Sequence, residues 1–204
     1  VNLVDYKKYQ KHLNLIKNNY FKNISNIKNL SFVFALSKIL KINLQKVIKA
    51  SNKFVGLDFR QQIIHNTKKL MIINDSKSTS LSSTKPLLES YKNIYWILGG
   101  LAKKGDKFKL NKKYFSKINA FIYGKDKNYF SKILNKKIRY KISNNLNDLL
   151  KFIFKDFSKK NNEKKIILFS PSAASFDQFK NFEDRGKYFN KNIKYYIKKY
   201  RNIL

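Results

Sequence analysis

From Gly56 onward, short apolar runs alternate with longer segments of helical apolar spacing, and this alternation constrains the fold more than any other feature of the sequence. The runs predict strands at Ile94–Leu98, Ala120–Tyr123, Arg139–Ile142 and Ile166–Phe169. The spacing predicts helices at Ser82–Tyr91, Asn128–Leu134, Leu146–Phe157 and Arg185–Tyr200. Because neighbouring parallel strands need crossover connections, the alternation indicates a largely parallel sheet covered by helices. Two further runs, Gln62–His65 and Leu70–Ile73, are joined by a polar turn and predict a hairpin.

The residues before Gly56 follow a different pattern, which is mostly helical. Apolar spacing predicts one helix over Asn26–Leu40 and a shorter one over Leu44–Ala50, whereas the first twenty or so residues look like the middle of a domain whose beginning is missing. We therefore expect two domains, 1–56 and 57–204. The expected fold class is α/β, a Rossmann-like and largely parallel sheet with flanking helices, preceded by a helical remnant of another domain.

The charge of the chain raises the question of a nucleic-acid partner. The net charge is +33, from 45 basic and 12 acidic residues, while a hydrophobic content of 43% argues against a disordered polycation. A basic surface attracts phosphate backbones. The lysines, however, are scattered through every segment. Arginine, which binds phosphates and bases better because its planar group donates two hydrogen bonds at once, occurs only at Arg60, Arg139, Arg185 and Arg201. We interpret the charge as composition drift typical of an AT-rich genome and expect no specific nucleic-acid partner, with weak polyanion binding left open as an alternative.

Cysteine and histidine exclude several site classes. The chain has no Cys, and its two His residues, His12 and His65, form no metal-ligand pair at helical spacing, so no metal site is expected in it. Leu30–Leu40, the most apolar early stretch, is too short to span a membrane. No membrane insertion and a cytoplasmic location are therefore expected.

Polar residues follow three of the predicted strands, where ligands bind on sheets of this kind. The segments are Ile72–Thr79, Trp96–Gly100 continued by Lys103-Lys104-Gly105-Asp106, and Leu168–Phe179. Helix N-termini favour anions, and a pair of glycines lets the backbone approach a ligand closely. We expect the three turns to converge on one edge of the sheet as an anion-binding cleft.

Each residue of these turns also has a simpler interpretation. Asp75 and Ser175 are suitable helix N-caps, Phe182 is a suitable core residue, and Lys77 and Lys103 each resemble an ordinary solvated lysine. A polar loop is expected over 159–165.

Taken together, the three segments resemble motifs of the Mur ligases, and within them the branch that adds D-glutamate. Asn74-Asp75-Ser76-Lys77-Ser78-Thr79 is similar to that family's Asn-Asp-Ser-Lys-Ala-Thr, and Gly99-Gly100 with Lys103 is similar to its Gly-Gly-x-x-Lys. Ser170-Pro171 with Ser175-Phe176-Asp177-Gln178-Phe179 and Phe182-Glu183-Asp184-Arg185-Gly186 resembles Ser-Pro-Ala-Cys-Ala-Ser-Phe-Asp-Gln-Phe and Phe-Glu-x-Arg-Gly. The Asp-Asn-Pro-Arg signature of the diaminopimelate- and lysine-adding relatives is absent.

The resemblance extends upstream to about Asn23. Asn23 and Asn26 match an Asn-x-x-Asn in the family's ATPase domain, and Gly56-Leu57-Asp58-Phe59-Arg60 matches a Gly-Leu-x-His-Arg hinge. The chain departs from the family at Lys22, Phe59, Gln62 and Ser172-Ala173-Ala174. It contains no Gly-Lys-Thr or Gly-Lys-Ser P-loop, and the family's UDP-binding domain and Mg²⁺ ligands are missing.

The resemblance implies that 1–56 is the incomplete C-terminal end of a central ATPase domain and that 57–204 is a C-terminal amino-acid-binding domain. It implies an ATP- and Mg²⁺-dependent, ADP-forming ligase that joins D-glutamate to UDP-N-acetylmuramoyl-L-alanine in peptidoglycan synthesis, and so acts in cell-wall biogenesis, cell shape and division. Nucleotide-side residues would be Asn23, Asn26, Arg60, Asp75 and Lys77, with Asp75 and Lys77 in positioning roles. Acceptor-side residues would be Thr79, Lys103, Ser175, Phe176 and Phe182.

Two alternatives stay open beside the ligase. In the ligase interpretation the chain is a working part of such an enzyme, inactive by itself and monomeric. The first alternative is a non-catalytic remnant of such an enzyme. The other alternative is a basic polyanion-binding module.

Overall fold

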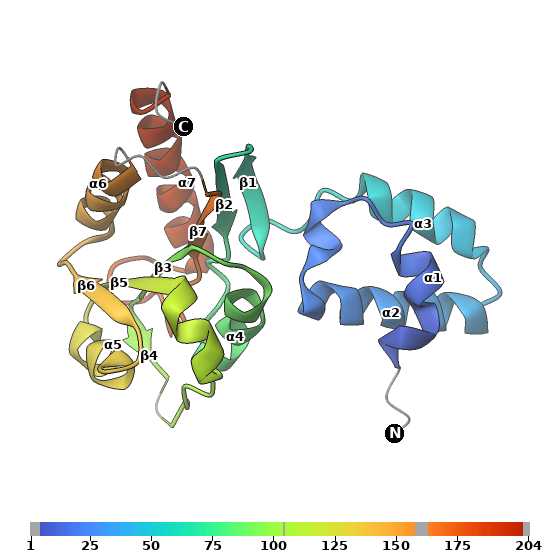
Figure 1. Cartoon of the computed structure of the whole chain (residues 1–204), viewed down its shortest axis with the longest axis horizontal. Coiled ribbons are helices and arrows are strands. Elements are labelled where there is room, and N and C mark those ends of the chain that lie inside the picture. The colour runs from blue at the N-terminus through green and yellow to red at the C-terminus, as the bar shows by residue number, and fades with distance from the viewer. Residues whose placement is uncertain (1–4, 104, 158–162, 202–204) are drawn as a thin grey trace. The chain divides into compact units, whose positions relative to one another are not determined.

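The computed structural model describes residues 5–103, 105–157 and 163–201, and the chain divides into two compact units, Val1–Gly56 and Leu57–Leu204 (Figure 1). These are the same bounds that the sequence pattern indicates for two domains. The assignment of the units to an ATPase domain and an amino-acid-binding domain stays a prediction.

The first unit is helical and has a small core. Its elements are η1 (Tyr6–Tyr9), α1 (Gln10–Leu13), η2 (Asn19–Lys22), α2 (Ile24–Ile39) and α3 (Leu44–Lys53). Leu30, Phe34 and Ile48 are the buried centre of this core. The predicted helical spacing of α2 is only partly a burial pattern, since Val33, Leu36 and Ile39 are exposed.

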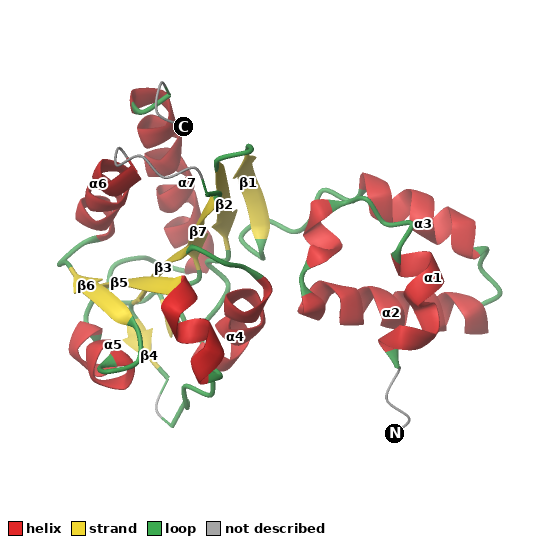
Figure 2. Cartoon of the chain, viewed as in Figure 1, coloured by secondary structure: helices red, strands yellow, loops and turns green. Residues whose placement is uncertain are grey.

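The second unit is built on a mixed, mostly parallel sheet of six strands in the order β1-β2-β7-β3-β5-β6 (Figure 2). The strands are β1 (Gln62–Asn66), β2 (Leu70–Asn74), β3 (Ile94–Gly99), β5 (Ile118–Tyr123), β6 (Arg139–Ile142) and β7 (Lys165–Phe169). β1 pairs antiparallel with β2, and every other pair is parallel. A separate antiparallel pair joins β4 (Leu101–Ala102) to β8 (Ala173–Ala174).

Helices cover both faces of this sheet, so side chains that alternate along a strand enter two different cores. The helices are η3 (Lys112–Lys117), α4 (Leu81–Ser90), α5 (Lys127–Leu134), α6 (Leu146–Phe157) and α7 (Phe182–Lys199). Ile73 and Trp96 belong to the core that includes residues of α4 and α5, and Ile72 and Ile97 belong to the core of α6 and α7. Burial on both faces explains why β2, β3 and β7 are continuous apolar runs.

The structure confirms the predicted α/β class, the hairpin and each of the predicted strands and helices, with ends displaced by up to three residues. Two displacements reach three residues: α3 ends at Lys53, and α7 begins at Phe182 because the Asn181 side chain caps it by accepting the N–H of Asp184. The strands β4 and β8 were not predicted, since two residues carry no periodicity. Most of the loop predicted over 159–165 lies outside the described residues, and Lys165 itself begins β7.

Candidate functional site

The three polar turns predicted from the sequence meet at the carboxyl edge of the sheet. The Asp75 N–H donates to the Phe169 carbonyl at 2.7 Å, which joins the ends of β2 and β7. The Gly99 N–H donates to the Pro171 carbonyl at 2.9 Å, and β4 pairs with β8 just beyond. The predicted convergence is therefore confirmed.

The turn after β2 is held by the first turns of α7. The Asn74 amide donates to the Gly186 carbonyl at 3.0 Å, and the Ser76 hydroxyl donates to the Phe182 carbonyl at 2.8 Å. On its other side the Lys77 N–H donates to the Phe59 carbonyl at 3.0 Å. This turn has few conformations open to it, so Lys77 leaves the sheet from a fixed backbone position.

Asp75 is buried inside this edge and is not a helix cap. Its carboxylate accepts the Ser170 hydroxyl at 2.7 Å and the Gln61 N–H at 3.1 Å, whereas α4 is capped by Ser80. Burial raises the pKa of Asp75 to about 7, although Ser170, Gln61 and the positive charges of Arg60 and Arg185 oppose the rise. The N-cap interpretation of Asp75 is therefore wrong.

A buried chain of hydroxyl groups continues from Asp75, and the sequence did not reveal it. The Thr84 Oγ1 lies 2.7 Å from Ser170 Oγ, 2.6 Å from Ser172 Oγ and 2.7 Å from Ser78 Oγ. Because hydroxyls both donate and accept, this chain connects the turns after β2 and β7 with the first turns of α4. Nothing in the printed sequence distinguishes these hydroxyls from the many other Ser residues.

Gly99 and Gly100 have positive φ angles of 139° and 129°, and a side chain at either would collide with the backbone. A Cβ atom would lie 2.0 Å from the Tyr123 carbonyl oxygen at Gly99 and 2.4 Å from the Ala174 carbonyl oxygen at Gly100. Close approach of three chain segments therefore requires glycine at both positions.

Lys103 follows these glycines and is exposed on a turn beside α4. The turn is tied to α4 by Asp106, whose carboxylate accepts the Leu81 N–H, and Leu81 comes two residues after the exposed Thr79. The tie brings the Lys103 and Thr79 segments to the same side of the edge. Lys104 lies outside the described residues.

The remaining residues predicted for the acceptor side come from the segment after β7. Ser175 is buried and is not a helix cap, because its carbonyl accepts the N–H groups of Gln178 and Phe179 in a turn and α7 is capped by Asn181. Phe176 is 70% exposed. Phe182 is only half-buried, which contradicts the core interpretation, and the Lys77 ammonium lies 3.7 Å from the centre of its ring.

Arg60 is exposed on the loop before β1 but its backbone is anchored. Its neighbours bond to the turn after β2, through the Phe59 carbonyl and the Gln61 N–H. A guanidinium on this loop therefore lies close enough to Asp75 to lower its pKa.

Asn23 and Asn26 belong to the first unit, where both are buried in local contacts. The Asn23 side chain caps α2 by accepting the Asn26 N–H at 2.9 Å, and the Asn26 amide donates to the Tyr20 carbonyl at 2.7 Å. The other eight predicted residues belong to the second unit, on segments that meet at the carboxyl edge of the sheet.

Arg185 is the functional candidate that sequence reasoning missed. It is fully buried in α7 and bonds to the turns after β2 and β7, and burial lowers its pKa. One signal was available, since Arg185 is one of only four arginines in a chain rich in lysine.

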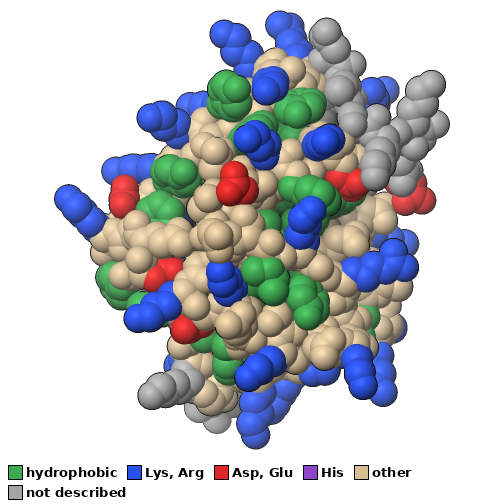
Figure 3. Space-filling view, turned by 90° about the vertical axis from the view of Figure 1, so that its left-hand side faces the viewer, with side chains coloured by type: hydrophobic (Ala, Val, Ile, Leu, Met, Phe, Trp, Pro, Cys, Tyr) green, Lys and Arg blue, Asp and Glu red, His purple; other side chains and the backbone are tan. Residues whose placement is uncertain are grey.

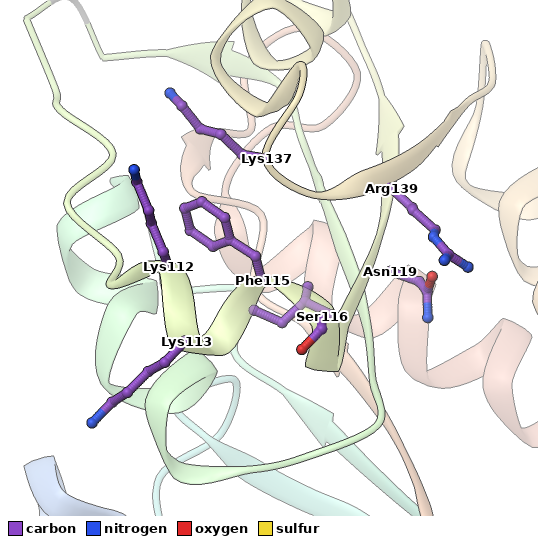
Figure 4. A pocket seen from close by; sticks show the side chains of 8 residues that line it. Lys112, Lys113, Phe115, Ser116, Asn119, Lys137 and Arg139 are labelled. Atoms are coloured by element: carbon purple, nitrogen blue, oxygen red, sulfur yellow. The ribbon is translucent and has the colours of Figure 1, made fainter.

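A cavity of about 490 Å³ lies elsewhere, at the amino ends of β5 and β6 (Figure 4). Lys112, Lys113, Lys137 and Arg139 line it, but Figure 4 shows their charged groups pointing in different directions. The Lys137 ammonium is already engaged by the Ile133 carbonyl at 2.9 Å. Figure 3 likewise shows basic side chains spread over one face of the molecule between apolar groups and a few acidic ones. Neither view shows cations converging on one ligand.

Clusters of metal-binding side chains and membrane-spanning helices are both absent from residues 5–103, 105–157 and 163–201. No group of three or more His, Cys, Asp and Glu residues that could hold a metal ion occurs there. None of the described helices is long and apolar enough to span a bilayer.

Curated proteins with similar sequences share one name. The chain is 36% identical over 165 residues to the UDP-N-acetylmuramoylalanine–D-glutamate ligase of a Wolbachia from Brugia malayi, covering 81% of the chain and 33% of that protein. It is 35% identical to the ligase of the same name from Rickettsia bellii (86% and 39%) and 36% identical to that from Francisella philomiragia (92% and 45%). The chain thus spans less than half the length of these relatives. No family model matches the sequence.

Solved structures with similar folds are Mur ligases. MurF from Acinetobacter baumannii has a TM-score of 0.59 at 14% identity, covering 84% of the chain and 38% of that protein. UDP-N-acetylmuramate–alanine ligase MurC from Thermotoga maritima has a TM-score of 0.57 at 17% identity, covering 84% and 38%. These structures show the fold alone.

Proposed function

Since the chain belongs to the Mur ligase family, we propose that it is the part of an ATP-dependent, ADP-forming ligase that holds D-glutamate for addition to UDP-N-acetylmuramoyl-L-alanine in the cytoplasm. One observation carries the proposal. The three segments that resemble motifs of the D-glutamate-adding branch are far apart in the sequence, yet they meet at one edge of the sheet.

The proposed reaction makes an amide in two steps. The carboxylate of UDP-N-acetylmuramoyl-L-alanine is converted to an acyl phosphate by ATP, and the amine of D-glutamate then attacks it, releasing phosphate. None of the residues at this edge needs to act as a nucleophile. Their task is to position D-glutamate and to neutralise its charge while water is excluded from the acyl phosphate.

D-glutamate brings two carboxylates, and each needs donors once water is excluded. Lys103 offers a cation beside Gly99-Gly100, and Thr79 and Ser175 offer hydroxyls from the neighbouring turns. Phe182 and the exposed Phe176 would limit the size of the side chain that enters.

Arg60, Asp75 and Lys77 are proposed to face the nucleotide, and a nucleotide-side role is proposed separately for Asn23 and Asn26 of the first unit. Lys77 has a second possible contact, because its ammonium lies over the ring of Phe182, an acceptor-side residue. A lysine held there stands between the two groups of residues and adds positive charge where a phosphate and a carboxylate would meet.

The test is binding of D-glutamate to the 204-residue chain, measured by calorimetry or by NMR titration with L-glutamate as control. We expect D-glutamate to bind in preference to L-glutamate. Loss of a shielded, charge-assisted hydrogen bond in Lys103→Ala should weaken that binding by roughly ten- to a hundredfold. Lys113→Ala, which removes an exposed lysine at the opposite edge, should leave it unchanged. Equal effects of the two substitutions, or no preference for the D form, would contradict the proposal.

Catalysis by the chain alone is a separate question. The sequence has no P-loop, so we propose that the isolated chain does not hydrolyse ATP. Phosphate release above background that disappears in Asp75→Ala would overturn this.

A further inference from the structure

We propose that Arg185 is a positioning residue that ties together the turns after β2, β3 and β7, so that their ligand-binding side chains act as one site. The inference rests on the proposed function, because it concerns the same D-glutamate site. Arg185 has no part in the roles assigned above.

Arg185 binds two of the turns directly. Its Nη2 donates to the Ser76 carbonyl at 2.7 Å and to the Ala173 carbonyl at 3.0 Å. Its Nε donates to the Ser76 hydroxyl at 3.1 Å. One planar guanidinium thus fixes the distance between the turn that carries Lys77 and the segment that carries Ser175. The ammonium of lysine is a point charge on a flexible side chain and lacks that planar arrangement of donors.

The third turn lies against the same guanidinium. A Cβ atom at Gly100 would come within 3.3 Å of Arg185 Nη1, so the backbone of Gly100 lies close to the guanidinium. Lys103 follows Gly100 by three residues in this turn. Arg185 therefore bonds to two of the turns and lies close to the third, while the residues proposed to bind D-glutamate lie farther along each turn.

Core packing alone is a poor explanation for this residue. Arg185 is fully buried, and the groups that accept its printed hydrogen bonds are the neutral oxygens of Ser76 and Ala173. Burying a cation is unfavourable even where carboxylates such as Asp75 and Asp177 lie near it, and apolar side chains of similar volume often stabilise a core better. A buried positive charge behind three turns also favours an anionic ligand in front of them.

The test uses the single tryptophan of the chain as a reporter. The Trp96 indole N–H donates to the Ser170 carbonyl at 2.9 Å, so its NMR signal senses the turn after β7. Arg185→Lys keeps the positive charge but loses the planar guanidinium and its fixed set of donors. We expect it to weaken D-glutamate binding roughly tenfold or more and to shift the indole signal and the Ser76, Gly100 and Ala174 amides in the free protein.

Ile193→Val is the matched control, because Ile193 is equally buried in α7 but belongs to the α6 and α7 core. It should change D-glutamate binding by less than about twofold. If Arg185→Lys does not fold, Ser76→Ala serves in its place, since it removes the hydroxyl that accepts from Nε, together with the bond from that hydroxyl to the Phe182 carbonyl. It should weaken binding by roughly two- to fivefold.

The outcomes separate this inference from the proposed function. Wild-type affinity and unshifted signals in Arg185→Lys overturn the inference, and so does an equal loss of affinity in Ile193→Val. If the wild-type chain does not bind D-glutamate, the proposed function fails, and the inference is decided by the ligand-free spectra. Shifts at all three turns then support it, and shifts confined to α7 overturn it.

Discussion

The two edges of the sheet in the second unit differ in what they do with polar groups. At the amino ends of β5 and β6, exposed cations surround a cavity of about 490 Å³ and point apart. At the carboxyl edge, Asp75, Ser170 and Arg185 are buried, and each turn is bonded to the next. The cavity and its exposed charges would draw attention to the first edge, whereas burial of polar groups that share hydrogen bonds selects the second. Desolvated polar groups are costly, so their concentration at one place is the stronger sign of a site.

The largest effect is expected where the carboxyl edge tolerates no side chain. Gly99→Ala places a Cβ atom 2.0 Å from the Tyr123 carbonyl oxygen, and the free energy of unfolding should fall by roughly 4–6 kcal/mol, through backbone strain and overpacking together. Gly105→Ala is the control, since Gly105 also has positive φ but nothing lies within 4 Å of its Cβ position. It should cost about 1 kcal/mol. Chemical denaturation measures both, and similar losses would show that the close approach at Gly99 is not what the edge depends on.

The next effect concerns the buried Asp75 carboxyl. Its pKa rises from 3.8 in the unfolded chain to about 7 in the fold, so the folded state holds the proton more tightly between these values. The free energy of unfolding should therefore be higher at pH 4 and fall as pH rises to 7. A shift of about 3 units corresponds to up to about 4 kcal/mol.

Asp75→Asn should remove this slope. The difference in unfolding free energy between wild type and variant, followed from pH 4 to pH 8, isolates the contribution of Asp75 from the other acids. A difference that does not vary with pH would mean that Asp75 ionises normally.

Gly99 and Asp75 also show which parts of the fold and of the site local sequence patterns can predict. The strands and helices followed from apolar runs and helical spacing, which are local properties. Gly99 and Asp75 were singled out because they follow predicted strands. Arg185 was not, because its partners Ser76 and Ala173 are 109 and 12 residues away, and no local pattern shows that its side chain is buried between them. The hydroxyl chain through Thr84 was missed for the same reason.

A smaller effect is expected from replacing an exposed arginine, of which each edge has one: Arg60 and Arg139. Arg60 is anchored beside Asp75, and Arg139 lines the cavity at the amino ends. In a ligase that carries this chain as its C-terminal part, Arg60→Ala should raise KM for ATP by roughly three- to tenfold, because a partly exposed cation near a phosphate is screened by solvent. Arg139→Ala should leave KM for ATP unchanged. Steady-state kinetics with ATP varied decides, and the reverse order would move the nucleotide to the amino edge.

The smallest effect is expected from the lysines of the amino edge. Lys112→Ala and Lys113→Ala remove exposed charges that point apart, and each should change the free energy of unfolding by no more than about 0.5 kcal/mol. D-glutamate binding should stay the same. Thermal unfolding and the titration described above measure both, and a large change in either would give that cavity a role.

The strand order has a consequence for how the chain is made. β7 lies between β2 and β3 in the sheet but follows both by many residues in the sequence. During synthesis from the N-terminus, β2 and β3 emerge before the strand that lies between them. The backbone groups along their facing edges therefore stay unpaired until residues 165–169 leave the ribosome. Because Ser170 and Arg185 come later still, the carboxyl edge is the last part to assemble, and a nascent chain stalled before β7 has neither a continuous sheet nor a site.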